Sequence, residues 1–148
     1  MVLNPKSRRY RPKLLWDGRS GGEVNFQDHP PLRLDMPKEF GGEGRYHCPD
    51  DLFFSAIGGC LLTTFLYFQR KLDFQLNGLQ ILIDGSVNLV GPEGYRITGL
   101  KAKLRIETVK GEEEKATECF ELMKDFCHIT RTLEGAVSME ITKEILLT

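Results

Sequence analysis

The sequence predicts an α+β fold in which a mostly antiparallel sheet packs on a long central apolar helix. Runs rich in β-branched residues lie on both sides of a charge-free stretch at residues 52–69, and an amphipathic helical pattern comes near the end. Strands that occur in groups, separated by helices, are typical of an antiparallel sheet in an α+β domain. The chain has 148 residues, of which 41% are hydrophobic, so we expect one domain over residues 1–148.

A basic arm, three short strands and a loop are expected before the long helix. The arm at residues 1–13 contains the cations Lys6, Arg8, Arg9, Arg11 and Lys13. We interpret the arm as a solvated tail or as an extended segment laid on a partner subunit. Turn residues separate candidate strands at 13–16, 23–27 and 32–36, which together suggest an antiparallel meander. After a loop at 37–48, Pro49 and the acidic residues next to it mark the start of a helix.

The second half of the sequence predicts a long hairpin, an amphipathic helix and a last strand. Residues 79–90 and 95–109 are rich in β-branched residues and flank a turn at 91–94. Apolar residues then recur at helical spacing, with charged residues opposite them. The apolar residues of this stripe are Ala116, Cys119, Phe120, Met123, Phe126 and Cys127. A strand at about 136–145 completes the expected order of elements.

The stretch at 52–69 is long and apolar enough to raise the question of a membrane. It runs for 18 residues without a charge, at the lower limit of the ~17–25 residues of a spanning helix. Gly58, Gly59 and several polar residues interrupt it, however, and no second such segment exists. We therefore interpret it as a helix covered on all faces inside a protein. In a chain this small, we expect a second subunit to supply part of the cover.

Charge and cysteine content narrow the classes of function. Twenty Lys and Arg against 21 Asp and Glu give a net charge of −1, so we expect neither nucleic acid nor a membrane as a partner. The N-terminus has no apolar run after its charges, and we expect a cytoplasmic protein without a secretory signal. In that reducing compartment, the four cysteines are buried structural thiols, metal ligands or redox groups.

Cys60 follows Gly58 and Gly59 inside the apolar helix. Taken alone, a free cysteine at such a position is most simply a small buried hydrophobe. The glycine pair needs a reason, because each glycine costs about 1 kcal/mol in a helix interior. If the pair bends or restarts the helix, Cys60 lies near a helix N-terminus, which favours its thiolate.

The other cysteines offer a redox pair or a metal site. Cys119 and Cys127 lie ~12 Å apart along one helix and cannot form a disulfide there, whereas Cys60 and Cys127 can meet only through the tertiary fold. His47-Cys48 and Cys127-His128 supply two sulfurs and two nitrogens, but adjacent ligands do not have the spacing that wraps a tetrahedral Zn²⁺. We expect no metal and no cofactor.

Together these residues resemble a known family, that of osmotically inducible protein C and the organic hydroperoxide resistance proteins (OsmC/Ohr). The resemblance covers nearly the whole chain after the basic arm, in matching order and spacing. It rests on the segments Trp16-Asp17-Gly18-Arg19-Ser20-Gly21, Pro37-Lys38-Glu39-Phe40-Gly41-Gly42, Pro49-Asp50-Asp51-Leu52, Ala56-Ile57-Gly58-Gly59-Cys60 and Cys127-His128-Ile129-Thr130-Arg131-Thr132-Leu133. It implies an intertwined homodimer of α+β fold that acts as a cysteine-based peroxidase.

The resemblance also implies roles for individual residues. Cys60 is then the peroxidatic thiolate, Cys127 the resolving cysteine, and Arg19 the group that lowers the pKa of the thiol and orients the peroxide. Asp50 stands where the family usually has Glu, which holds this arginine. Arg45 offers a second guanidinium, because branches of the family differ in the loop that supplies it. His128 replaces a common Pro after the distal cysteine.

The leading functional hypothesis is a peroxidase that reduces organic hydroperoxides with a dithiol such as a lipoyl compound. The alternative is a non-enzymatic dimer, either a redox sensor or a small-ligand binder, with buried structural cysteines. Phe53, Phe54, Phe65 and Met123 either line an apolar substrate pocket or belong to the core. If Cys60 attacks peroxide, we expect charge to outweigh burial and to hold it as a thiolate at neutral pH.

Overall fold

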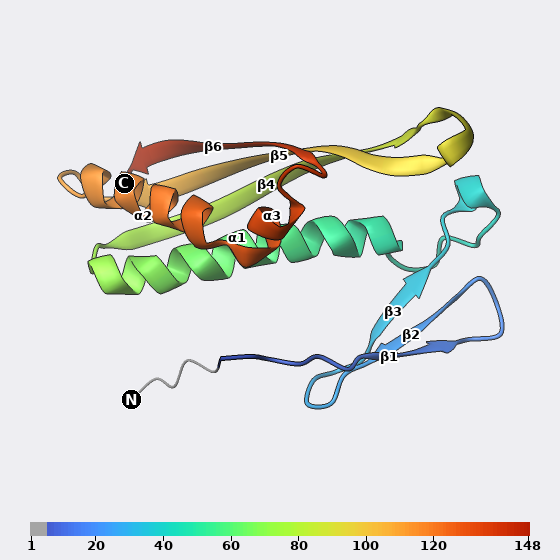
Figure 1. Ribbon diagram of the computed structural model, residues 1–148. Helices are drawn as coiled ribbons and strands as arrows, with labels where there is room; N and C mark the ends of the chain where they lie inside the picture. The colour runs from blue at the N-terminus through green and yellow to red at the C-terminus, as the bar shows by residue number, and fades with distance from the viewer. Residues whose placement is uncertain (1–5) are drawn as a thin grey trace. The chain divides into compact units, whose positions relative to one another are not determined.

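The computed structural model describes residues 6–148, which divide into an N-terminal unit that ends at Leu52 and a C-terminal unit at Phe53–Thr148. The N-terminal unit is built on a three-stranded antiparallel sheet in the order β1-β2-β3. Its strands are β1 (Lys13–Trp16), β2 (Gly21–Asn25) and β3 (Leu32–Asp35), and a short 3-10 helix, η1 (Lys38–Phe40), follows them (Figure 1). The meander expected from the turn residues is therefore confirmed.

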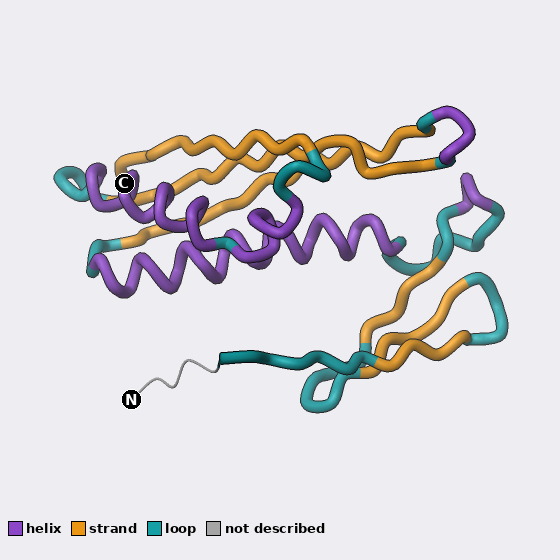
Figure 2. Tube along the Cα trace, in the orientation of Figure 1, coloured by secondary structure: helices purple, strands orange, loops and turns teal. Residues whose placement is uncertain are grey.

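The C-terminal unit contains most of the long helix α1 (Pro49–Leu72) and a second three-stranded sheet, in the order β4-β5-β6. Strands β4 (Leu76–Leu89) and β5 (Tyr95–Thr108) form the expected hairpin around the 3-10 turn η2 (Gly91–Glu93). Helices α2 (Glu113–Phe126) and α3 (His128–Leu133) lead to the last strand, β6 (Ser138–Leu147). Figure 2 shows the helices of this unit on one face of its sheet.

The core lies between this sheet and the helices. From Leu100 to its end, strand β5 alternates between buried and outward residues, and it buries Leu100, Ala102, Leu104 and Ile106 against the helices. Helix α1 contributes Ile57, Cys60, Leu61 and Phe65, and α2 contributes Ala116, Cys119, Phe120 and Met123. The apolar stripe predicted for residues 116–127 is thus the inner face of α2 and of the turn after it.

Residues 6–148 cover helix α1 only in part. By length and composition it is the helix of residues 6–148 that qualifies as a membrane span, with a mean hydropathy of 1.5 and 22% of its apolar window buried. Its inner face nevertheless forms the core against the sheet, and its exposed residues include Ala56, Gly59, Leu62 and Tyr67. Successive members lie three to five positions apart, so an apolar strip along this helix has no cover from residues 6–148.

Three features differ from what the sequence suggested. Helix α1 runs unbroken from Pro49 to Leu72, so Gly58 and Gly59 neither restart it nor create a helix N-terminus at Cys60. The sheet is mostly antiparallel as expected, but β6 joins β5 in parallel, because α2 and α3 carry the chain back across the sheet between the two strands. The helical turn α3 immediately after Cys127 was not anticipated.

Candidate active site: two facing thiols and an imidazole

Cys60 lies on the inner face of α1, with 7% of its surface exposed. The neighbouring Gly58 also faces the sheet, where an added Cβ would meet the Ile83 side chain at 3.1 Å. Gly59 faces away, and an added Cβ there would have no neighbour within 4 Å. The two glycines therefore serve different surfaces. Gly58 allows β4 to approach the helix closely beside Cys60, whereas Gly59 keeps the outer surface of the helix flat.

Cys127 occupies the bend between α2 and α3 and is fully buried. Its backbone is held on both sides, since its N–H donates to Met123 O at 2.9 Å and its carbonyl accepts the Arg131 N–H at 3.1 Å. The Thr130 hydroxyl donates to the same carbonyl at 3.1 Å. The bend thereby holds the Cys127 side chain toward α1.

The two thiols face each other, with 3.1 Å between Cys60 Sγ and Cys127 Sγ. Both cysteines are free, and the Cys127 thiol donates to the Cys60 sulfur. A disulfide needs a sulfur separation of about 2.05 Å, so a shift of about an ångström would bring the pair to bonding distance. Residues 67 positions apart in the chain are thus ready to form a disulfide without unfolding either helix.

The imidazole of His128 completes the cluster. Its Nδ1 lies 3.7 Å from Cys60 Sγ, within reach of a hydrogen bond to sulfur, and Thr64 Oγ1 lies 3.9 Å from the same sulfur. The His128 side chain is exposed, whereas both sulfurs are buried. The imidazole therefore stands between the thiol pair and solvent.

Burial determines the electrostatics of Cys60 in the single chain. Desolvation is the largest effect and raises the pKa of Cys60, and the interaction with the neighbouring Cys127 side chain raises it further. The backbone N–H of Ile129 and the Thr64 hydroxyl lower the pKa, but to a smaller extent. The expectation that charge outweighs burial at Cys60 is therefore wrong for the isolated chain. The thiolate needs a further proton acceptor or cation.

The other two cysteines have different surroundings. Cys119 is fully buried and donates to Phe65 O at 3.3 Å, and burial raises its pKa to about 12. Such a thiol is protonated and inert at neutral pH. Cys48 belongs to the N-terminal unit, where it is half-buried beside the start of α1.

Arg45 is the centre of a carboxylate network in the N-terminal unit. Its Nε lies 2.8 Å from Asp35 Oδ2 and 3.0 Å from Glu43, and its Nη2 lies 2.7 Å from Asp17. Asp35 is completely buried and also accepts hydrogen bonds from the Ser20 hydroxyl and the Met36 N–H. These donors hold the pKa of Asp35 well below its usual range. Arg45 is thus committed to its own unit by three carboxylates.

Arg19 is bound more loosely than Arg45. Its guanidinium pairs with Glu43 at 2.6 Å, and 60% of its side chain is exposed. Asp50, the carboxylate that the sequence suggested as its partner, lies in the first turn of α1 with its side chain exposed. In the described residues Arg19 therefore has Glu43, and not Asp50, as its partner. The catalytic roles of Arg19 and Asp50 stay predictions.

A family model of the OsmC-like proteins matches residues 42–142, which include both facing cysteines and His128. The chain belongs to the OsmC-like protein family. None of the curated protein sequences compared with it gave a significant match. The recognition from sequence motifs is therefore confirmed at the level of the family.

Solved structures of OsmC-like proteins share the fold at low sequence identity. An organic hydroperoxide resistance protein OsmC from Legionella pneumophila is 22% identical, with a TM-score of 0.74 over 93% of this chain and 97% of that one. An OsmC-like protein from Mycoplasma pneumoniae is 19% identical, with a TM-score of 0.77 over 95% and 98%. An organic hydroperoxide resistance protein from Vibrio cholerae, with captopril bound in one active site, is 20% identical, with a TM-score of 0.70 over 95% of each chain.

An apolar hollow lies beside the reactive pair of this OsmC-like chain. Its volume is about 260 Å³, and its lining consists of Thr63, Thr64, Tyr67, Phe68 and Phe126. Thr64 touches both the hollow and Cys60 Sγ, so the hollow adjoins the thiols. Of the candidates named from sequence, Phe65 and Met123 are core residues. The aromatic lining was missed, although residues 60, 64, 67 and 68 share one side of a helix and carried the signal.

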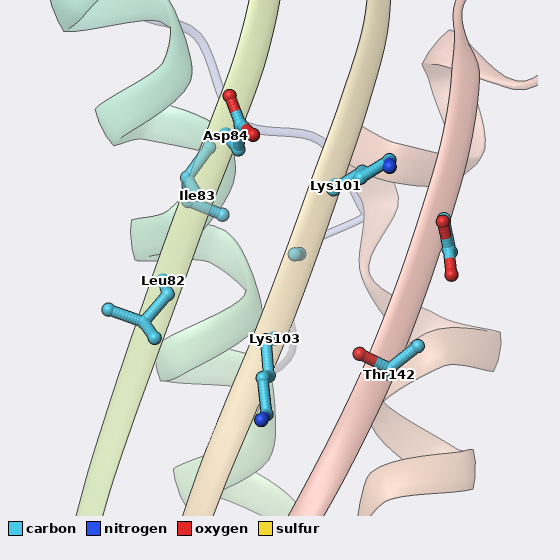
Figure 3. A pocket seen from close by; sticks show the side chains of 8 residues that line it. Leu82, Ile83, Asp84, Lys101, Lys103 and Thr142 are labelled. Carbon is cyan, nitrogen blue, oxygen red and sulfur yellow. The ribbon is translucent and has the colours of Figure 1, made fainter.

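Two other features of the OsmC-like chain do not extend the site. Among residues 6–148, no group of three or more His, Cys, Asp and Glu side chains is arranged to hold a metal ion. A second hollow of about 270 Å³ lies on the sheet face opposite the helices, where Figure 3 shows Leu82, Asp84, Lys101, Lys103 and Thr142. It contains no thiol, and Lys103 there pairs with Glu144.

Proposed function

We propose that this OsmC-like protein is a cytoplasmic thiol peroxidase that reduces organic hydroperoxides to alcohols through Cys60 and Cys127. The observation that carries the proposal is the 3.1 Å separation of two free thiols, one of them on a continuous helix and the other on a backbone-locked bend. A structural core has no need for two thiols in contact with each other and an imidazole beside one of them. Family membership and the fold support the same assignment.

The reaction follows from the positions of the two sulfurs. The Cys60 thiolate attacks the terminal oxygen of ROOH, the S–O bond forms, the O–O bond breaks, and the alkoxide leaves to become ROH after it gains a proton. The Cys127 sulfur then attacks the sulfenic sulfur, the S–S bond forms as the S–O bond breaks, and the leaving hydroxide takes up the proton of the Cys127 thiol to become water. Because the second sulfur is already in contact, closure is fast compared with overoxidation of Cys60.

Of the two arginines, Arg19 is the better candidate to stabilise the transition state of peroxide reduction. The pKa of Cys60 is raised by burial, so a fixed positive charge is needed to favour the thiolate and to hold the peroxide oxygens. Arg45 has three carboxylate neighbours, whereas Arg19 has one and is exposed. We assign this role to Arg19, with Asp50 as the carboxylate that would hold it in the active arrangement.

The hollow beside Thr64 favours an organic peroxide over hydrogen peroxide. Aromatic side chains form most of its lining, and its volume of about 260 Å³ suits a small apolar group. An alkyl or aryl chain placed there directs its peroxide end toward Cys60. The disulfide product lies beneath an exposed imidazole in a confined site, so a small dithiol of the lipoyl type is the expected reductant.

A homodimer is part of the proposal. The stripe of Ala56, Gly59, Leu62 and Tyr67 on α1 is exposed in the single chain, and the missing side chain at Gly59 serves no contact within it. Small residues on an apolar helix surface allow a second helix to approach closely. A second copy of α1 is the simplest occupant of this stripe, and the pairing would bury part of the aromatic hollow.

Peroxide consumption with matched cysteine variants tests the function. The purified protein, given cumene hydroperoxide and dihydrolipoamide, should turn over, and Cys60→Ser should be at least about 1000-fold slower because it lacks the nucleophile. Cys127→Ser should react once and then accumulate sulfinic acid at Cys60, visible by mass spectrometry. Cys119→Ser, at an inert buried thiol, is the control. Wild-type protein without activity, or Cys60→Ser with full activity, would contradict the peroxidase function. The redox-sensor or ligand-binding alternative would then remain.

A further inference from the structure

We propose that His128 is a catalytic residue that takes the proton of the Cys60 thiol and returns it to the leaving alkoxide. The inference rests on the peroxidase function proposed above and adds a proton acceptor to it. Its basis is the position of Nδ1, 3.7 Å from Cys60 Sγ. The general acid–base role requires the imidazole tautomer that carries its proton on Nε2, so that Nδ1 is free to accept.

Cys60 needs such an acceptor. Burial and the interaction with the Cys127 side chain raise its pKa, so the resting thiol holds its proton at neutral pH. Helix α1 continues through Cys60 and offers no free helix N-terminus there. Among residues 6–148, Cys127 and His128 are the titratable groups in contact with the sulfur, and the sheet residue Ile83, which lies against the nearby Gly58, is apolar.

His128 is held in place and remains open to solvent. Its carbonyl accepts the Thr132 hydroxyl at 2.6 Å, which fixes the first turn of α3. The charged neighbours Asp125 and Arg131 form no hydrogen bond or ion pair with Cys60 or His128 within residues 6–148. The exposed imidazole therefore exchanges protons with water while its Nδ1 faces a buried sulfur. No packing role accounts for a histidine at this position.

No proton is gained or lost overall in the first half-reaction. The Cys60 S–H proton moves to Nδ1, which produces a thiolate and an imidazolium. The thiolate takes the terminal OH of ROOH to form Cys60–SOH, and the O–O electron pair leaves on RO⁻. The imidazolium then protonates RO⁻ to ROH, so His128 returns to its neutral form and no external acid is consumed. Imidazole is suited to both transfers because it changes charge near neutral pH.

Substitutions at His128 test this role in a Cys48→Ser background. There, the tryptic peptide 46–70 contains Cys60 as its single thiol, so its alkylation by iodoacetamide can be followed by mass spectrometry. His128→Ala and His128→Asn should each raise the pH midpoint of Cys60 alkylation by at least about one pH unit, because neither side chain accepts the proton. His29→Ala, an exposed histidine in a loop of the N-terminal unit, is the matched control and should leave the midpoint unchanged.

Single-turnover oxidation by cumene hydroperoxide gives an independent readout. At pH 7, both His128 variants should be about 100-fold slower than wild type, the usual range for loss of a general base. Added imidazole should partly restore His128→Ala but not Cys60→Ser. Circular dichroism checks folding, and the near-isosteric Asn variant covers the case in which Ala unfolds.

The outcomes separate the two proposals. Wild-type alkylation midpoints and oxidation rates in His128→Asn would overturn the assignment of His128 even if the protein is a peroxidase. If the wild-type protein consumes no peroxide, the proposed function fails. The alkylation midpoints then still decide whether His128 is the proton acceptor of Cys60, since that measurement needs no peroxide.

Discussion

Side chains of the same type have structural roles at some positions and chemical roles at others. Cys60 and Cys127 belong to one buried cluster, whereas Cys119 donates to a backbone carbonyl and is chemically silent. The two arginines differ in the same way, because Arg45 is surrounded by carboxylates whereas Arg19 is exposed. In each case the surroundings, and not the residue type, determine which group is available for reaction.

Asp35 should stabilise the N-terminal unit in a pH-dependent way. The pKa of this buried carboxyl is depressed by hydrogen bonds from Ser20, Arg45 and Met36, so its stabilisation is present above the unfolded-state pKa of about 3.9 and is lost as the pH falls through the folded-state value. Asp35→Asn should lower the melting temperature by roughly 5–10 °C at pH 7. The difference from wild type should shrink below about pH 4. Equal melting curves at pH 7 would show that the network contributes nothing.

Secondary-structure elements bring the reactive groups together. The unbroken helix α1 presents Cys60 on its inner face, and the bend between α2 and α3 presents Cys127 and His128 to it. The parallel return of β6 requires a crossover through those two helices, which is why they cross the same sheet face as α1. The crossover through α2 and α3 therefore produces both the parallel pairing of β6 and the assembly of the site.

Gly58 should set how closely β4 approaches α1. Gly58→Leu forces a larger side chain against Ile83 and should cost about 1–3 kcal/mol in urea unfolding. Gly58→Ala should stay within about 1 kcal/mol of wild type, because the gain in helix propensity offsets the tight 3.1 Å contact. A leucine variant as stable as the alanine variant would mean that Ile83 simply moves aside.

At the scale of the whole molecule, residues 6–148 leave two apolar features of α1 and its surroundings uncovered. The outer stripe of α1 and the aromatic hollow are both exposed, and the hollow adjoins the buried thiols through Thr64. A second subunit would cover the exposed residues of α1 and narrow the aromatic hollow. Catalysis and association are therefore expected to depend on the same helix.

Sedimentation should show a dimer at micromolar concentration. Gly59→Arg places a charge on the exposed stripe of α1 and should weaken the dimer by at least about 100-fold in dissociation constant, because the charge would be buried without a partner. His29→Arg adds the same charge in an exposed loop and should leave the dimer intact. A wild-type protein that stays monomeric, or a Gly59→Arg variant that remains fully dimeric, would contradict the pairing through α1.

The sequence by itself determined most of the elements and the family. Local periodicity placed the strands, the hairpin and the stripe of α2 to within a few residues, because side chains of one element must share a face. Motifs around Cys60 and Cys127 were sufficient to recognise an OsmC-like chain.

Only the tertiary structure decided which groups meet. Cys60 and Cys127 are 67 residues apart, and no periodicity within one element links them or directs His128 to the sulfur. The parallel direction of β6 and the commitment of Arg45 to Asp35 also depend on long-range contacts. Burial, which raises the pKa of Cys60, is likewise a property of the assembled fold. Pattern along the chain fixes local conformation, whereas proximity and desolvation arise only when the elements pack.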